Sequence, residues 1–180
     1  MSDITTKSNQ RTRLIISLVA SILMGLTFLV SGSGKVIGFG ELPGQTMDFL
    51  DSIIPAVLLT PSVAYFIGYI LIPYIIPWME LALGIFLVLS IWPRFVAILC
   101  LLLTMAFMAN NSWLIAQGME NFPSCACFGI WEEMFGTLTP LQSLGYDIVL
   151  FLLALTVIFV RPGGFFSLPQ WLAKLGKRGN

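Results

Sequence analysis

Two cysteines separated by a single residue are the part of this sequence best suited to chemistry. Cys125 and Cys127 stand in the stretch SCACFG at 124–129. A disulfide between them would close a very small ring, in which the near-perpendicular C–S–S–C dihedral is hard to reach without strain. Strained, exposed disulfides are the more oxidising and labile ones. Because a small ring also adds little stability as a staple, the pattern favours thiol exchange, with Cys125 and Cys127 as the catalytic residues.

Other roles for the cysteine pair stay open. The two thiols could form a structural disulfide, each could bond to a partner protein, or together they could bind a soft metal such as Cu(I). The chain has no histidine, which excludes Ser-His and Cys-His catalysis, histidine metal sites and histidine-ligated haem. Because the cysteine pattern favours thiol exchange over metal binding, we predict no metal site, and no resident cofactor is evident. The third cysteine, Cys100, is predicted to pack between helices, far from the pair.

The composition shows which kind of structure must hold these cysteines. Of 180 residues, 57% are hydrophobic and only 10% are charged, the latter about half the usual share in soluble proteins. This number of charged side chains is too small to cover the surface of a water-soluble protein. The excess apolar area must therefore face lipid. The formal net charge is +0, which gives no support for nucleic-acid binding. We predict one transmembrane domain, 1–180, with the lipid bilayer as its main partner.

Four apolar stretches are long enough for membrane helices, which need about 20 residues each. The fold class predicted is therefore all-α, an integral membrane four-helix bundle. Pro73 and Pro77 lie inside the second stretch, where they predict kinks. The predicted spans cover residues 14–33, 63–92, 95–115 and 141–160.

Basic residues predict the orientation of these spans, because positive charge is retained in the cytoplasm. With the N-terminus inside, Lys35 is the only basic residue outside. The other eight are cytoplasmic: Lys7, Arg11, Arg13, Arg94, Arg161, Lys174, Lys177 and Arg178. We therefore expect a multi-pass protein with both termini cytoplasmic, and the cysteine pair on the outer, oxidising side.

Two further elements are expected outside the spans. Apolar residues recur at helical spacing between Asp48 and Pro61, which suits a short helix on the outer surface, although a plain loop fits as well. After the sequence RPGG at 161–164, apolar and basic residues are interspersed up to Arg178. That C-terminal segment is predicted to be amphipathic and to lie at the cytoplasmic membrane interface.

Ionisable residues within the spans are the second group of candidates, because charge inside a bilayer is costly. Glu80 is expected near the midplane, Asp147 in the outer half of the fourth span, and Lys35 at the outer end of the first. The long lysine side chain could form an ion pair or hydrogen bond with Asp147 or with Glu80. A purely structural polar contact is one interpretation, and a proton relay or a quinone head-group site is the other.

Three motifs together resemble the MauE/DoxX family of four-helix membrane proteins. They are FLVSGSGK at 28–35, PWMELALG at 77–84 and CACFG at 125–129, and the likeness extends over about residues 13 to 160. The position of the cysteine loop, between the third and fourth spans, points to the MauE branch, methylamine utilisation protein E and its relatives.

The resemblance implies a redox-associated protein of the bacterial cytoplasmic (inner) membrane. MauE relatives are linked to maturation of disulfide-containing periplasmic proteins, and the related DoxD proteins to a thiosulfate:quinone oxidoreductase. By this resemblance Cys125 and Cys127 would exchange disulfides with a separate protein partner on the outer face. The alternative is a non-catalytic subunit of a larger membrane complex, in which the helices pack on partners and the cysteine loop is a staple or docking surface.

Overall fold

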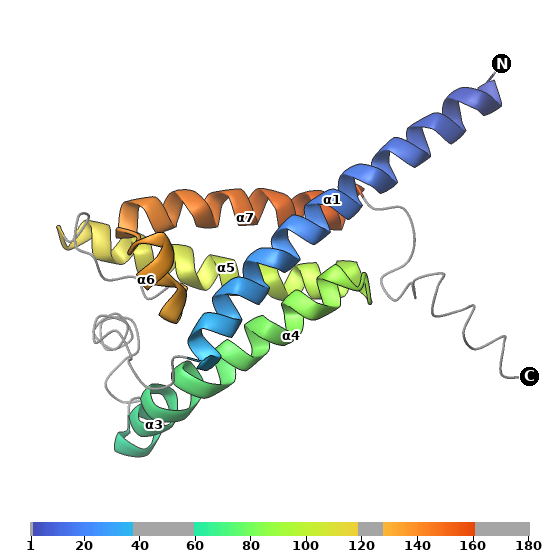
Figure 1. The fold of residues 1–180 in the computed structure, drawn as a ribbon. Helices are drawn as coiled ribbons and strands as arrows, with labels where there is room; N and C mark the ends of the chain where they lie inside the picture. Colours follow the sequence, from blue (N-terminus) through green and yellow to red (C-terminus); the bar gives the residue numbers. More distant parts are fainter. Residues whose placement is uncertain (1, 38–59, 119–127, 161–180) are drawn as a thin grey trace, which may run out of the picture.

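The computed structural model of the chain is all-helical and describes residues 2–37, 60–118 and 128–160. Its three longest helices are α1 (Ser2–Ile37), α5 (Pro93–Ala116) and α7 (Pro140–Val160) (Figure 1). Each is long and apolar enough to cross a membrane, α1 through its segment Asn9–Ile37. These helices confirm the all-α prediction, and as candidate membrane helices they coincide with three of the four predicted spans.

The second predicted span has a different internal structure from the single helix expected over 63–92. Three segments follow one another directly: α3 (Pro61–Phe66), the π-helix η1 (Ile67–Ile75) and α4 (Ile76–Val88). Pro73 lies in η1 and Pro77 near the start of α4. Proline has no N–H to donate, and its ring clashes with the carbonyl four residues before it, so regular α-helical bonding is interrupted. Between the two prolines the Ile76 N–H bonds instead to Leu71 O, five residues back, as in a π-helix.

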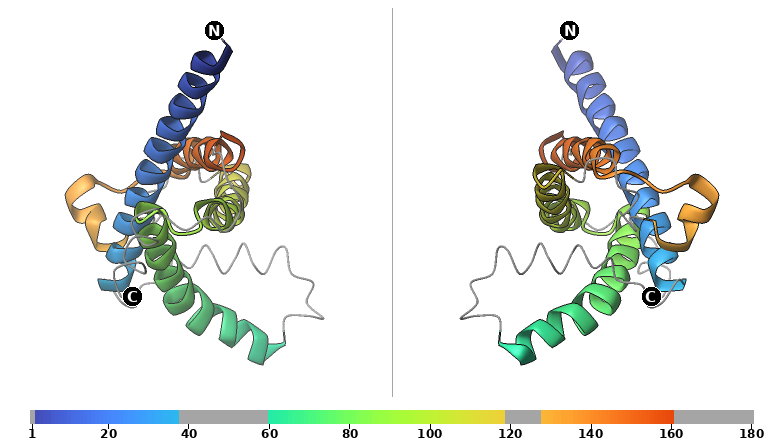
Figure 2. Two further views of the ribbon diagram at one scale, coloured as in Figure 1. Left: turned by 90° about the vertical axis from the view of Figure 1, so that its right-hand side faces the viewer. Right: turned by 90° about the vertical axis from the view of Figure 1, so that its left-hand side faces the viewer.

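The wide helical turns change the path of the chain, as the two prolines predict. Figure 2 shows the segment from α3 to α4 curving away from the other helices. Among the described helices, α4 by itself has 13 residues, too few to cross a hydrocarbon core that takes about 20. A membrane crossing here must use all three segments together.

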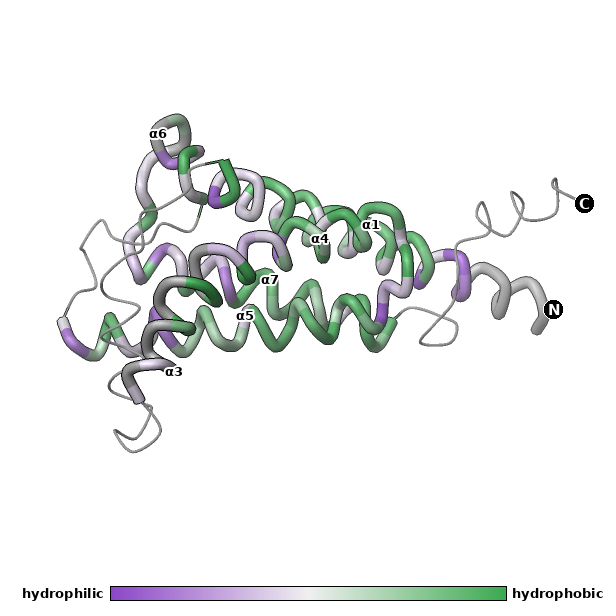
Figure 3. The backbone as a smooth tube through the Cα atoms, turned by 90° about the horizontal axis from the view of Figure 1, so that it is seen from below, coloured by the Kyte–Doolittle hydropathy of each residue, from purple (hydrophilic) through white to green (hydrophobic). Residues whose placement is uncertain are grey.

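The helices form two pairs that meet along α1. Helix α4 packs against α1, and α5 packs against α7, while α1 also contacts α7 (Figures 1 and 2). A short turn joins α4 to α5, with Ser90 and Trp92 both at positive φ, 54° and 43°. The hydropathy colours in Figure 3 run apolar along the bundle and polar toward the ends.

Glycines bring α1 and α4 into close contact. A Cβ added at Gly84 would lie 2.9 Å from Gly25 O, and one at Gly32 would lie 2.6 Å from Leu81 N. Because only hydrogen fits at these positions, the two backbones approach more closely than larger residues would allow. Gly32 lies in a stretch of small residues, SGSG at 31–34, which lets α4 approach this part of α1.

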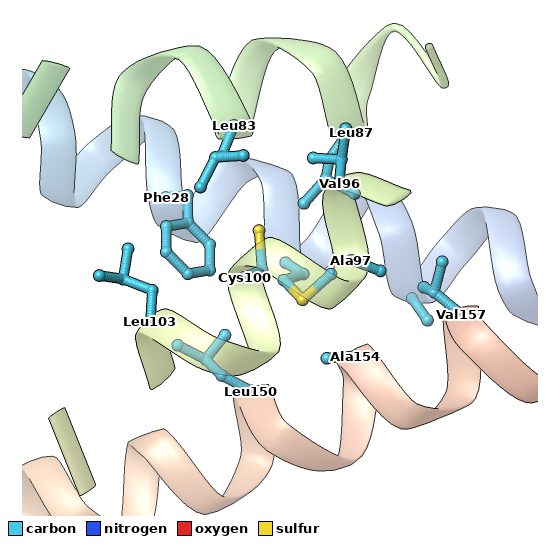
Figure 4. Packing of buried hydrophobic residues seen from close by; sticks show 12 residues of the cluster. Phe28, Leu83, Leu87, Val96, Ala97, Cys100, Leu103, Leu150, Ala154 and Val157 are labelled. Atoms are coloured by element: carbon cyan, nitrogen blue, oxygen red, sulfur yellow. The ribbon is translucent and has the colours of Figure 1, made fainter. Parts of the chain in front are cut away.

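The interior of the bundle combines an apolar cluster with several buried polar groups. Cys100 is completely buried and unpaired, in agreement with its predicted packing role. Figure 4 labels Phe28, Leu83, Leu87, Val96, Ala97, Leu103, Leu150, Ala154 and Val157 beside it. Meanwhile Leu102 is 58% and Phe159 77% exposed. Such exposed apolar side chains suit contact with lipid, so the buried polar groups are the unusual feature.

Several predicted features lie outside the described residues. These are the expected surface helix before Pro61, the amphipathic C-terminal segment, and both Cys125 and Cys127. The membrane orientation, with both termini cytoplasmic, stays a prediction from the charge distribution.

Candidate functional site

A buried ion pair joins α1 to α4. Glu80 is 0% exposed, and its Oε1 lies 2.7 Å from Lys35 Nζ. The same ammonium donates to Oε2 at 2.9 Å, and the Ser31 hydroxyl also donates to Oε2, at 2.9 Å. Ser31 and Lys35 are one helical turn apart, so both reach the same carboxylate. Of the two partners considered for Lys35, the structure selects Glu80.

The position of Glu80 on α4 explains its complete burial. It shares the buried face of α4 with Leu83, Gly84 and Leu87, at offsets of three, four and seven residues. This face is the one that contacts α1 through Gly84. Removing a carboxylate from water is costly unless a cation and hydrogen bonds replace the water, and Lys35 with Ser31 supplies both.

Helix α5 completes the surroundings of Lys35. The Lys35 side chain is 20% exposed, and its Nζ lies 5.1 Å from the centroid of the Phe107 ring. A cation over an aromatic face is attracted by the ring quadrupole. Lys35 therefore contacts α5 and α4 from its place in the last turn of α1.

Asp147 belongs to a second buried polar contact, between α5 and α7. Asn111 Nδ2 donates to Asp147 Oδ2 at 2.8 Å and to Ser143 Oγ at 3.0 Å. Ser143 and Asp147 are one turn apart on α7, and all three residues are buried. Asp147 thus pairs with a neutral amide, and Lys35 does not bond to it.

Asn111 is a site residue that was not among those predicted from the sequence, because the polar run NNS at 110–112 stands near the end of an apolar span, where polar residues are common. The signal was its periodicity. Asn111 follows Cys100 by eleven residues and Thr104 by seven, which places all three on the buried face of α5. A polar residue on a buried, mostly apolar face of a membrane helix indicates a hydrogen-bonding partner on a neighbouring helix.

The chain that follows the cysteine pair packs directly on the last turn of α1. A Cβ at Gly34 would overlap the carbonyl oxygen of Phe128, and one at Gly129 would overlap the backbone of Gly34. Trp131, at the end of the 3-10 helix η2 (Gly129–Trp131), donates from Nε1 to Ser33 Oγ at 3.1 Å. We call these five residues, Ser33, Gly34, Phe128, Gly129 and Trp131, the α1–η2 crossing.

Phe128 is fixed by further contacts besides the crossing. Its ring meets Tyr146 of α7 edge to face, with centroids 5.7 Å apart. Its N–H donates to Oε1 of Glu132, at the start of α6 (Glu132–Phe135), at 3.2 Å. The Tyr146 hydroxyl lies 3.3 Å from Thr27 Oγ1 on α1. Three helices therefore constrain the residue that directly follows Cys127 in the sequence.

The sequence matches, over residues 13–160, the family described as methylamine utilisation protein MauE. This chain belongs to the MauE family. No curated protein and no solved structure matches it. The resemblance inferred from the three sequence motifs is confirmed, and the matched range contains the cysteine pair, both buried carboxylates and Lys35.

In this MauE-family protein the predicted site residues therefore fall into three groups. Lys35 and Glu80 come together on α1 and α4, and Asp147 forms a separate contact beside Tyr146. Cys125 and Cys127 precede the crossing in the sequence and lie outside the described residues. Within the described ranges, no group of three or more Cys, Asp or Glu residues could hold a metal ion.

Proposed function

We propose that this MauE-family protein exchanges disulfides through Cys125 and Cys127 at the extracytoplasmic face, in the maturation of a disulfide-containing protein. The observation that carries the proposal is the α1–η2 crossing. It fixes Phe128, one residue after Cys127, against the membrane bundle. A thiol pair that directly precedes a residue held at the end of the bundle is suited to meeting a soluble partner at the membrane surface.

The charge distribution supports an outward-facing cysteine pair. Both α1 and α5 begin at the end of the bundle that is opposite α6 (Figure 1). Arg94 lies in the first turn of α5, and Arg11 and Arg13 lie in the N-terminal half of α1. Because positive charge is retained in the cytoplasm, that end is the cytoplasmic one, and the chain near Phe128 faces the oxidising compartment.

The proposed reaction is a two-step exchange. A client thiolate attacks one sulfur of the Cys125–Cys127 disulfide, which forms a mixed disulfide and releases the other cysteine as a thiolate. The second client thiolate then displaces the first cysteine. The client is oxidised by two electrons, and the cysteine pair is reduced and takes up two protons. Re-oxidation of the cysteine pair passes the two electrons and two protons on to a membrane carrier, for which a quinone is the candidate class.

Thiol trapping in intact membranes tests the proposal. A membrane-impermeant alkylating mass tag is applied before and after mild reduction, and again after an oxidant is restored. We expect a disulfide that opens readily and re-forms, and mixed disulfides with a client in Cys125→Ser and Cys127→Ser. Cys100→Ser is the matched control, because its buried thiol should leave the pattern unchanged.

The opposite result would support the alternative, a non-catalytic subunit of a membrane complex. A bond that resists reductant, with lower protein levels in both serine variants and no trapped mixed disulfide, would point to a structural staple. In that case the thiol-exchange proposal fails.

A further inference from the structure

The α1–η2 crossing is a contact of backbone on backbone that only glycine permits. Besides the overlap with Phe128 O, a Cβ at Gly34 would lie 2.5 Å from Trp131 Cδ1. A Cβ at Gly129 would lie 2.6 Å from Lys35 N. Gly129 also has φ +56°, a conformation that glycine adopts without steric cost. A side chain at either glycine must push the two segments apart.

The buried ion pair holds one side of this crossing. Ser31 and Lys35 flank Gly34 in the last turns of α1, and both bond to Glu80 on α4. The ion pair therefore fixes the turn of α1 that η2 packs against. The main helix pairings do not depend on the crossing, since α1 meets α4 through Gly25 and Gly84 and α5 packs on α7.

We propose that the α1–η2 crossing, fixed by the Lys35–Glu80 ion pair, positions the Cys-x-Cys segment for disulfide exchange. This inference rests on the proposed function. Gly34, Gly129 and Trp131 are positioning residues, which act through the chain they hold and not on the sulfur atoms. Exchange requires the attacking sulfur to approach one S–S bond in a defined geometry, and holding the neighbouring residue still reduces the orientational freedom that each encounter must overcome.

Gly34→Ala is the variant that tests the crossing, and Gly145→Ala is its matched control. A Cβ at Gly145 on α7 would meet nothing within 4 Å, so the control makes the same chemical change one residue from Tyr146 without a clash. Trp131→Phe is a milder second variant, which removes the hydrogen bond to Ser33 Oγ and part of the ring but keeps an aromatic side chain. If Gly34→Ala accumulates poorly, the test continues with Trp131→Phe.

Three measurements on the full chain in nanodiscs or membranes separate positioning from simple folding. Hydrogen exchange of the amides at 128–135 reports whether the crossing forms. The rate of disulfide re-formation is measured per folded molecule after a reductant pulse. The equilibrium of the cysteine pair with glutathione reports whether formation of the α1–η2 crossing is linked to the redox state of the pair. A structural change that favours one redox form must shift this equilibrium.

We expect Gly34→Ala to lose amide protection at 128–135 and to re-form its disulfide about tenfold more slowly. Its glutathione equilibrium should shift roughly threefold or more, because a crossing that favours one redox form of the cysteine pair changes this equilibrium when it is lost. Trp131→Phe should change each readout in the same direction by less, and Gly145→Ala should match the wild type.

Two results would overturn the positioning role. One is lost protection at 128–135 with an unchanged rate and an unchanged glutathione equilibrium, in either test variant. The other is full protection in Gly34→Ala, which would mean that the crossing does not form as described. A wild-type protein that never re-forms its disulfide would instead overturn the proposed function itself, and the inference with it, so the two failures are distinguishable.

Discussion

The two buried carboxylates of this protein are stabilised in different ways. Glu80 is 0% and Asp147 5% exposed, and both lie on apolar helices. Glu80 faces an ammonium at 2.7 Å, whereas Asp147 faces the neutral amide of Asn111 at 2.8 Å. Glu80 is therefore in direct contact with a cation, whereas Asp147 is in direct contact with a neutral hydrogen-bond donor.

This difference follows the division of the bundle into two helix pairs. The Glu80 contact joins α1 to α4, and the Asp147 contact joins α5 to α7. A protonated carboxyl group still accepts a hydrogen bond through its carbonyl oxygen, so the Asp147 contact can persist in either protonation state. The Lys35–Glu80 contact depends on charge. The α1–α4 pair is thus the one that should fail when charge is altered, and Asp147 remains the candidate for a proton relay.

The largest effect should come from removing the cation alone. Lys35→Met leaves Glu80 as an uncompensated buried charge, and breaking a buried pair in this way costs about 3–5 kcal/mol. The free energy of unfolding in mixed micelles measures it. A loss below about 1 kcal/mol would show that the ion pair contributes little to stability, as when water replaces the ammonium.

A double-mutant cycle should separate the two carboxylates. Lys35→Met with Glu80→Gln should recover much of the stability lost in the single variants, with a coupling of about 2 kcal/mol or more, because the residues are in direct contact. Lys35→Met with Asp147→Asn should be nearly additive, within about 0.5 kcal/mol. Equal couplings in the two cycles would contradict the pairing described here.

A smaller effect is expected at Asp147. Asp147→Leu leaves Asn111 Nδ2 without its carboxylate acceptor, which should cost about 1–3 kcal/mol. Asp147→Asn keeps an acceptor oxygen and should cost less than about 1 kcal/mol. The same unfolding measurement compares the two variants. If asparagine were as damaging as leucine, the negative charge would matter at this position as it does at Glu80.

The smallest effect should follow from Tyr146→Phe, beside Asp147. This variant removes the hydroxyl that lies 3.3 Å from Thr27 Oγ1 in an exposed position and keeps the ring that contacts Phe128. We expect a loss of about 0.5 kcal/mol or less, measured as above. A loss comparable with that of Asp147→Leu would show that this bond between α1 and α7 contributes more than its geometry indicates.

Much of the architecture was predictable because bilayer thickness imposes long apolar segments on the sequence. The helices α5 and α7 end within two residues of the predicted spans 95–115 and 141–160. The second span was less predictable. The prolines indicated a departure from regular helix. The π-helical turns of η1, however, depend on which carbonyl oxygens accept hydrogen bonds around Pro73, and residue types alone do not specify these acceptors.

The site was predictable in its members more than in its pairings. Lys35, Glu80 and Asp147 stood out as charges in apolar segments, but the choice between the two carboxylates depends on how α1 and α4 rotate against each other, which Gly25, Gly32 and Gly84 decide. The α1–η2 crossing could not be predicted, because Gly34 and Gly129 lie on segments far apart in the chain, and two isolated glycines carry no periodic signal.

The order of Lys35 and Glu80 along the chain has a consequence for biogenesis. A protein is synthesised from its N-terminus, so α1, which carries the ammonium, is complete before the ribosome reaches Glu80, 45 residues later. When the segment with the buried carboxylate enters the lipid, its counter-charge is already in the membrane. Lys35 is therefore the charge that enters the membrane without its partner. Its long side chain can extend to the membrane surface, where the ammonium stays hydrated until Glu80 arrives.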